Sequence, residues 1–320
     1  MRYACRVRHI VGWMVLACSL SAQSQYPSRP LRVIVPFAAG SVNDLVARVI
    51  AAPLADALGQ PLVIDNRAGA AGNLGAEVAA KAAPDGYTLF VGNVSHTISV
   101  SLYDRLNYDF LNDFAPISQI AAGGFLVAVH PSLPVKSVKE LVGLARGRPD
   151  ELNVGVGGAG MIAAVELFKS TTAIRMTNVA YKGTPQILTA LASGEVSVAF
   201  PPTSSVVPQV KSGKVRGLAV TGRLRSPMAP DIATVAESWF PGYEATTWYC
   251  LMAPGRTPNE IVARLNAELR VVLGRPEVRS RFAATDLAPL PSTPEQLTRF
   301  LRAEIAKWGS VVKASGMKPE

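Results

Sequence analysis

Residues 31–48 read LRVIVPFAAGSVNDLVAR, and this stretch decides the fold. The apolar run Leu31–Val35 predicts a buried strand, and the pattern from Asn43 onward predicts a helix. Only small residues separate the two, so backbone N–H groups of the turn and of the first helical turn are free to face a bound anion. The alternative is an ordinary strand-to-helix turn of a parallel sheet.

The same unit recurs along the first third of the chain. Residues 62–65 predict a second strand, with a loop of small residues at 66–72 and a helix at 73–82, and residues 87–92 predict a third strand. Strands that alternate with helices predict a parallel sheet, which binds ligands beyond the carboxyl ends of its strands. His96, in the loop expected there, is either a ligand contact or an ordinary loop residue.

A second set of alternating strands and helices spans residues 125–221 and predicts a second parallel domain. The segments that begin at Phe125 and Trp248 resemble each other, because each is an apolar run followed by a proline, a short loop and a helix. We therefore predict that the chain crosses between the domains near Gly124 and again near Thr247, which creates a hinge and a cleft. The predicted fold class is α/β, with two doubly wound domains joined by a two-strand hinge: residues 25–124 with 247–320, and residues 125–246.

The first 24 residues have the layout of an export signal, with basic residues up to Arg8, an apolar run at 10–20 and then small residues. Lipid attachment at Cys18 is the less favoured alternative. Without the three arginines of this segment the formal charge falls from +9 to +6 and is spread along the chain, which suits an anionic ligand better than nucleic acid. Cys250 would then be the only cysteine, so no internal disulfide is expected.

Few residues could carry catalysis. No common nucleophile, metal or phosphate motif occurs, so we predict no catalytic residue, no metal and no cofactor. The run GVGGAG at 155–160 fits G-x-G-x-x-G and offers the alternative of an NAD(P)-binding oxidoreductase. The acid that would hold the ribose is missing, although Lys182 could meet a 2′-phosphate. The simpler interpretation is that these glycines expose N–H groups to a ligand in the cleft.

Five motifs in order resemble the Bug family, the periplasmic receptors of tripartite tricarboxylate transporters. They are YPSRPLRVIVPFAAGSVNDLVAR (26–48), NRAGAAGNLGAEVAAKAAPDGYTL (66–89), SLYDRLNYDFLNDFAPIS (101–118), VAYKGT (179–184) and PGYEATTWYCLMAPGRTP (241–258). The resemblance implies a type II periplasmic binding protein, monomeric and without catalytic activity. Such a receptor closes on a small organic anion and delivers it to a membrane permease. A periplasmic sensor subunit that presents its ligand to a membrane kinase is a further alternative.

The resemblance also implies which loops hold the ligand. In the first domain two loops hold a carboxylate, and the expected residues are Phe37, Ala39, Gly40, Ser41, Asn43, Asp44, Ala70, Gly72 and Asn73. Asn93, Ser95 and His96 join them from the end of the third strand. In the second domain the expected residues, which would set specificity, are Gly158, Ala159, Gly160, Tyr181, Lys182, Gly183 and Pro201.

The sequence departs from the family pattern in four places. Val42 and Cys250 replace residues that are usually small, the segment after Gly160 is short and lacks a usual histidine, and Pro201 and Pro202 stand where an aspartate is common. The second-domain half of the pocket is therefore expected to be less polar than usual. A partly apolar or aromatic acid is as compatible with this pattern as a tricarboxylate.

Overall fold

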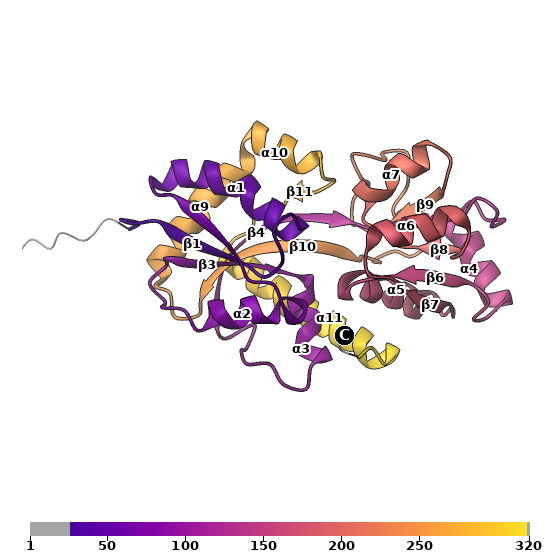
Figure 1. The fold of residues 1–320 in the computed structure, drawn as a ribbon, viewed down its shortest axis with the longest axis horizontal. Coiled ribbons are helices and arrows are strands. Elements are labelled where there is room, and N and C mark those ends of the chain that lie inside the picture. Colours follow the sequence, from indigo (N-terminus) through magenta and orange to yellow (C-terminus); the bar gives the residue numbers. More distant parts are fainter. Residues whose placement is uncertain (1–25, 319–320) are drawn as a thin grey trace, which may run out of the picture.

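A computed structural model describes residues 26–318, which form two α/β lobes, each built on one sheet (Figure 1). The predicted export signal at 1–24 lies outside the described residues. We call residues 26–124 with 246–318 the first lobe and residues 125–245 the second lobe. None of the described helices is long and apolar enough to cross a membrane.

The first lobe is built on a six-stranded sheet in the order β11-β4-β10-β3-β1-β2. Its strands are β1 (Leu31–Val35), β2 (Leu62–Asn66), β3 (Thr88–Asn93), β4 (Phe114–Gly124), β10 (Thr246–Pro254) and β11 (Ala288–Pro289). Its helices are α1 (Val42–Leu58), the 3-10 turn η2 (Ala70–Gly72), α2 (Asn73–Ala80), α3 (Val94–Leu102), α9 (Asn259–Gly274), α10 (Pro276–Ala283) and α11 (Pro294–Ser315).

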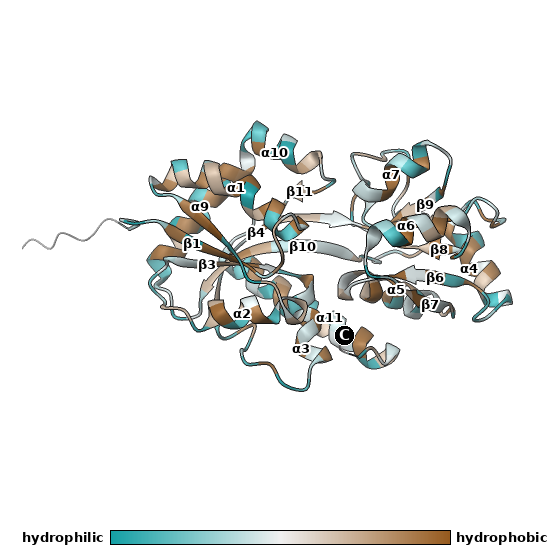
Figure 2. Ribbon diagram, in the orientation of Figure 1, coloured by the Kyte–Doolittle hydropathy of each residue, from teal (hydrophilic) through white to brown (hydrophobic). Residues whose placement is uncertain are grey.

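Strand β1 is buried on both faces, as its apolar run predicts. Leu31, Val33 and Val35 pack with the helices α1, α9 and α10, whereas Ile34 packs on the opposite face with α2, α3 and α11. Figure 2 shows the corresponding hydropathy. Strands β1 and β3 are hydrophobic, whereas α10 carries hydrophilic residues. The first lobe is therefore doubly wound.

The second lobe is built on a five-stranded sheet in the order β7-β6-β8-β5-β9. Its strands are β5 (Leu126–Val129), β6 (Asn153–Val156), β7 (Thr177–Ala180), β8 (Val198–Ala199) and β9 (Arg216–Val220). Its helices are α4 (Val138–Gly147), α5 (Ala159–Thr172), α6 (Thr184–Ser193), α7 (Thr203–Lys211) and α8 (Val235–Ser238). The predicted α/β class is confirmed, and β4 and β10 carry the chain between the lobes (Figure 1).

The prediction of a purely parallel second domain is wrong. Strand β5 runs antiparallel to both of its neighbours, β8 and β9, and in the first lobe β10 runs antiparallel to β3 and β4. These are the strands that the chain enters directly from the other lobe, without a crossover helix. A helix crossover returns the chain in the same direction, whereas a direct crossing does not.

The expectation of a loop at residues 93–96 is also wrong, because α3 begins at Val94. Asn93 caps this helix by accepting a hydrogen bond from the N–H of Ser95 at 3.0 Å. The N–H of Asn93 in turn lies 3.1 Å from Nδ1 of His96. The β-branched residues of this segment disfavour a helix, but the cap and the burial of Ile98 override that preference.

Candidate functional site

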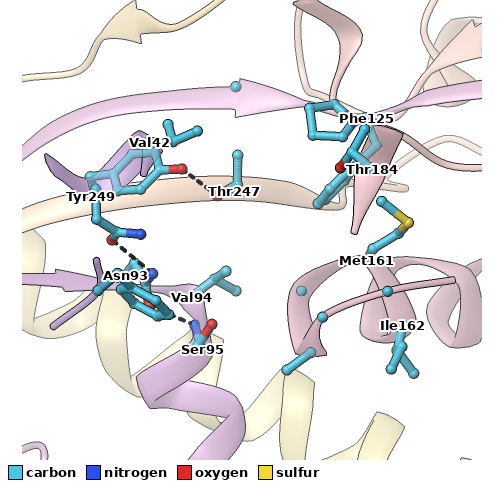
Figure 3. Close-up of a pocket in the computed structure, with 18 of the residues that line it drawn as sticks. Val42, Asn93, Val94, Ser95, Phe125, Met161, Ile162, Thr184, Thr247 and Tyr249 are labelled. Atoms are coloured by element: carbon cyan, nitrogen blue, oxygen red, sulfur yellow. Dashed lines mark hydrogen bonds between the residues drawn. The ribbon is translucent and has the colours of Figure 1, made fainter. Parts of the chain in front are cut away.

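A cavity of about 660 Å³ lies between the two lobes, beside the crossing strands. Figure 3 shows Asn93, Ser95 and Tyr249 on one side of it and Phe125, Met161 and Ile162 on the other. Side chains and backbone from both lobes therefore surround the same space, as expected for a ligand cleft between domains.

The predicted site residues divide into those that line the cavity and those that stand next to it. The lining ones are Phe37, Asn43, Asn93, Ser95, Gly158, Ala159 and Gly160. The others are not among the lining residues, and they are Ala39, Gly40, Ser41, Asp44, Ala70, Gly72, Asn73, His96, Tyr181, Lys182, Gly183 and Pro201. Their chain neighbours Ala71, Thr184 and Pro202 take the lining positions instead. No ligand contact is thereby established for any of them.

Asp44 organises the turn between β1 and α1 rather than facing the cavity. Its carboxylate accepts hydrogen bonds from the N–H of Gly40 at 3.0 Å, from Nε of Arg48 at 2.8 Å and from Nδ2 of Asn66 at 3.1 Å. These contacts, chiefly the one from Arg48, hold the pKa of Asp44 below its usual range. The Gly40 N–H, which the sequence suggested for ligand binding, is therefore already used within the protein.

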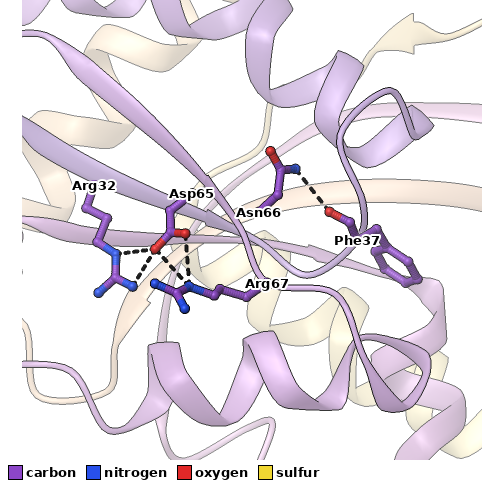
Figure 4. A network of polar contacts seen from close by, with 5 residues as sticks. All are labelled: Arg32, Phe37, Asp65, Asn66 and Arg67. Carbon is purple, nitrogen blue, oxygen red and sulfur yellow. Dashed lines mark hydrogen bonds and ion pairs between the residues drawn. The ribbon is translucent and has the colours of Figure 1, made fainter.

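Asn66, at the end of β2, makes a second hydrogen bond that holds the same turn. Its amide nitrogen also donates to the carbonyl of Phe37 at 3.0 Å, as Figure 4 shows. Beside it, Asp65 accepts hydrogen bonds from Arg32 and Arg67, which anchors the end of β2 to β1 and to the following loop (Figure 4). The turn between β1 and α1 is thus held by Asp44 of α1 and by Asn66 of β2.

A chain of amide hydrogen bonds fixes which atom Asn43 offers to the cavity. The N–H of Ser95 donates to Oδ1 of Asn93, so the other amide atom of Asn93, Nδ2, must donate, and it does so to Oδ1 of Asn43 at 2.9 Å. Asn43 lines the cavity, and its Nδ2 donates to no described residue. The amide therefore has N–H donors that are not used by the described residues, which is the polarity that a carboxylate requires.

His96 lies behind the side chains of Asn43 and Asn93 that line the cavity. Its ring is fully buried, stacks on Phe110 with ring centroids 5.4 Å apart, and meets Phe90 edge-on. Burial lowers the pKa of His96 to about 4, so the ring is neutral at physiological pH. In the described residues His96 holds the N-terminus of α3 and does not line the cavity.

The second loop of small residues has three consecutive residues with a left-handed backbone. Ala70 and Ala71 have φ of 48° and 53°, and Gly72 has φ of 95°. A side chain on Gly72 would also meet the ring of Phe37 at 3.1 Å and Nε2 of His96 at 3.2 Å. Position 72 therefore needs glycine, whereas Ala70 and Ala71 adopt a left-handed conformation that alanine rarely takes.

The second lobe contributes helix N-termini to the cavity. The helices α5, α6 and α7 all begin at residues that line it, and none of the three has a side-chain cap or an acidic residue in its first turn. Their first N–H groups, such as those of Ala159 and Thr203, therefore have no intrahelical acceptor. The positive ends of the three helix dipoles lie at the cavity.

Sequence reasoning missed several lining residues. Thr247 and Tyr249 come from β10, Ala284–Leu287 comes from the loop after α10, and Met317 and Lys318 follow α11, so residues far apart in the chain meet only through the tertiary fold. Burial raises the pKa of Tyr249 to about 12, and its hydroxyl accepts a hydrogen bond from Thr247 at 3.2 Å. Cys250, in contrast, is buried and is not among the lining residues.

Val42 lines the cavity at the first position of α1 and is 46% exposed. Replacing Val42 with Gly should widen the range of acids that bind, with bulky acids gaining about fivefold or more in affinity, because removing a crowded isopropyl group relieves about 1 kcal/mol or more. Titration calorimetry over a panel of acids measures this change. Val42→Ala is the matched control that keeps the helix propensity. Unchanged affinities for the whole panel would show that this side chain does not limit the ligand.

Comparisons with known proteins agree on one family. Residues 46–317 match the tripartite tricarboxylate transporter family receptor, TctC. BugT of Bordetella pertussis is 33% identical over 320 residues, covering 98% of each chain. The solved structure of R. palustris Rpa4515 with adipate is 38% identical, with a TM-score of 0.77, and covers 92% of this chain and 100% of that one. MatC (Rpa3494) from Rhodopseudomonas palustris with bound malate is 34% identical, with a TM-score of 0.73, and covers 90% and 100%. The chain therefore belongs to the tripartite tricarboxylate transporter receptor family, as its motifs predicted.

Proposed function

We propose that this receptor captures a small organic carboxylate in the cavity between its lobes. The observation that carries the proposal is that five helices, α1, α3, α5, α6 and α7, begin at residues that line one cavity. Helices α5, α6 and α7 have no side-chain cap and no acidic residue in the first turn, whereas α1 and α3 are capped by Ser41 and Asn93. The three uncapped N-termini present N–H groups and positive dipole ends, so their convergence favours an anion. The relatives that were solved with adipate and malate support the same ligand class.

The charges around the cavity are consistent with this proposal. Among the described lining residues the only charged side chains are Asp286 and Lys318. Binding would therefore rely on N–H donors, including the Asn43 amide, rather than on an arginine or lysine clamp. Apolar side chains such as Phe125, Met161 and Ile162 would contact the hydrocarbon part of the ligand.

We further propose that residues 25–124 with 247–320 and residues 125–246 move as two domains about β4 and β10. The membership of the strands in two separate sheets supports this division. We also propose that segment 1–24 directs export and that the protein is monomeric and without catalytic activity. It would deliver its ligand to a membrane permease. These proposals rest on the family assignment and on the layout of the first residues. The family assignment favours this role over the dinucleotide-binding alternative.

A thermal unfolding panel tests ligand capture. A carboxylate at 100 times its dissociation constant should add about 2.7 kcal/mol to the free energy of unfolding. Adipate and malate are the first acids to test, with 1,6-hexanediol as a control of the same carbon length as adipate but without charge. The proposal fails if no di-, tri- or aromatic carboxylate stabilises the protein, or if hexanediol stabilises it as much as adipate does.

A further inference from the structure

Asp286 belongs to the first lobe, but its carboxylate is bound by the second lobe. It lies in the loop between α10 and β11, and it is 7% exposed. Its Oδ1 accepts a hydrogen bond from the hydroxyl of Ser226, which follows β9 and is 6% exposed. Met228 donates its N–H to the same hydroxyl at 3.0 Å, so the Ser226 proton is directed at Asp286.

Burial raises the pKa of Asp286, and the hydroxyl of Ser226 opposes that increase by stabilising the charged form. Thr203 stands at the start of α7, and its hydroxyl lies 3.1 Å from the carbonyl of Gly124, the last residue of β4. The Ser226–Asp286 and Thr203–Gly124 hydrogen bonds thus join the two lobes next to a crossing strand.

The loop that carries Asp286 is fixed to that crossing strand. Strand β11 pairs with Ala121 and Ala122 of β4, and a side chain on Gly123 would meet the carbonyl of Asp286 at 2.9 Å. The loop therefore cannot move away from β4 without breaking the end of the first sheet. Any rotation of the second lobe about β4 must instead change the distance between Asp286 and Ser226.

We propose that Asp286 is a positioning residue that, through Ser226, holds the two lobes at the angle that forms the cavity. It adds a buried side-chain hydrogen bond to the two crossing strands and to the packing of α5 against α3 and α11, and it acts on ligand capture by biasing this angle rather than by contacting the ligand. The inference rests on the proposed function for its biological meaning. A hydrogen bond to a charged, buried group is strong enough to shift a two-state equilibrium by about tenfold or more.

The backbone at Asp286 guides the choice of variants. Its φ is 58°, a conformation that Asn and Asp tolerate better than other side chains. Asp286→Asn therefore keeps the loop and one acceptor oxygen but removes the charge, whereas Asp286→Ala removes the acceptor. Ser226→Ala breaks the same bond from the second lobe and leaves the loop unchanged.

The decisive experiment measures the angle between the lobes without any ligand. Spin labels at two exposed positions, Arg270→Cys in the first lobe and Lys139→Cys in the second, give a distance distribution by double electron–electron resonance. We expect Asp286→Ala and Ser226→Ala to shift or broaden it alike, the double variant to add nothing, and Asp286→Asn to fall between. An unchanged distribution, or a change in Asp286→Ala that Ser226→Ala does not reproduce, overturns the proposal. If Asp286→Ala does not fold, Ser226→Ala and Asp286→Asn decide.

Adipate binding then separates this inference from the proposed function. The adipate dissociation constant should rise about tenfold in Asp286→Ala and Ser226→Ala, because fewer molecules have the binding-competent angle. An equal dissociation constant in wild type and both variants would also contradict the positioning role. If the wild-type protein binds no carboxylate, including adipate and malate, the proposed function fails. The role of Asp286 is then still tested by the spin-label distances measured without ligand.

Discussion

Replacing Asn93 with Asp should weaken carboxylate binding at least about a hundredfold while the protein stays folded. Both oxygens of the new side chain accept hydrogen bonds, so Asn43 must turn its Nδ2 toward residue 93 and its Oδ1 toward the cavity. The added negative charge would also lie beside the carboxylate of the ligand, and such like-charge pairs cost several kcal/mol. Helix α3 should persist because Asp is as good an N-cap as Asn. Calorimetry with adipate, next to a circular dichroism spectrum, measures both effects.

Asn93→Ser is the matched control for this prediction. Serine also caps helices, carries no charge, and is too short to reach Oδ1 of Asn43. We expect Asn93→Ser to bind adipate about tenfold more weakly, because the hydrogen bond that orients the Asn43 amide is lost. If Asn93→Asp binds adipate as well as the wild type does, the carboxylate is not held at the wall formed by Asn43 and Asn93.

Replacing Asp44 with Ala should lower the free energy of unfolding by about 2–4 kcal/mol. The loss would remove three hydrogen bonds to the Asp44 carboxylate, from the N–H of Gly40, Nε of Arg48 and Nδ2 of Asn66, each worth about 1 kcal/mol. The turn before α1 should then lose its fixed geometry, so adipate binding should weaken as well. Urea unfolding monitored by fluorescence measures the stability. Ser41→Ala is the control, because it removes only the helix cap and should cost about 1 kcal/mol.

The contribution of Asp44 should depend on pH in one direction. The folded-state pKa of Asp44 is depressed, with the hydrogen bond from Arg48 as the main cause, so its stabilisation is complete above the unfolded pKa of about 4 and is lost as the pH falls through the folded value. The difference in stability between the wild type and Asp44→Asn should therefore be constant from pH 6 to 8 and shrink at lower pH. A difference that grows as the pH falls would contradict this role.

Local patterns in the sequence were sufficient for the elements near the site. The strand Leu31–Val35 and the turn after it follow from apolar spacing and small residues, and the helix expected from Asn43 begins one residue earlier, at Val42. The division into domains at Gly124 and Thr247 stays a prediction, which rests on the two similar segments that begin just after these positions. In contrast, α3 was not predicted, since its residues favour a strand and its helical state depends on the cap and on burial in the aromatic cluster.

Residue patterns alone predicted the α/β class and the turn of small residues at 36–41, because hydrophobic periodicity acts over a few neighbouring residues. Only the tertiary structure decided the reversed direction of β5 and β10, the donor that Asn43 presents and the contact of Asp286 with Ser226. The Asn43–Asn93 and Ser226–Asp286 pairs are 50 and 60 positions apart in the sequence. Their geometry depends on how whole sheets and lobes pack, which no local pattern specifies.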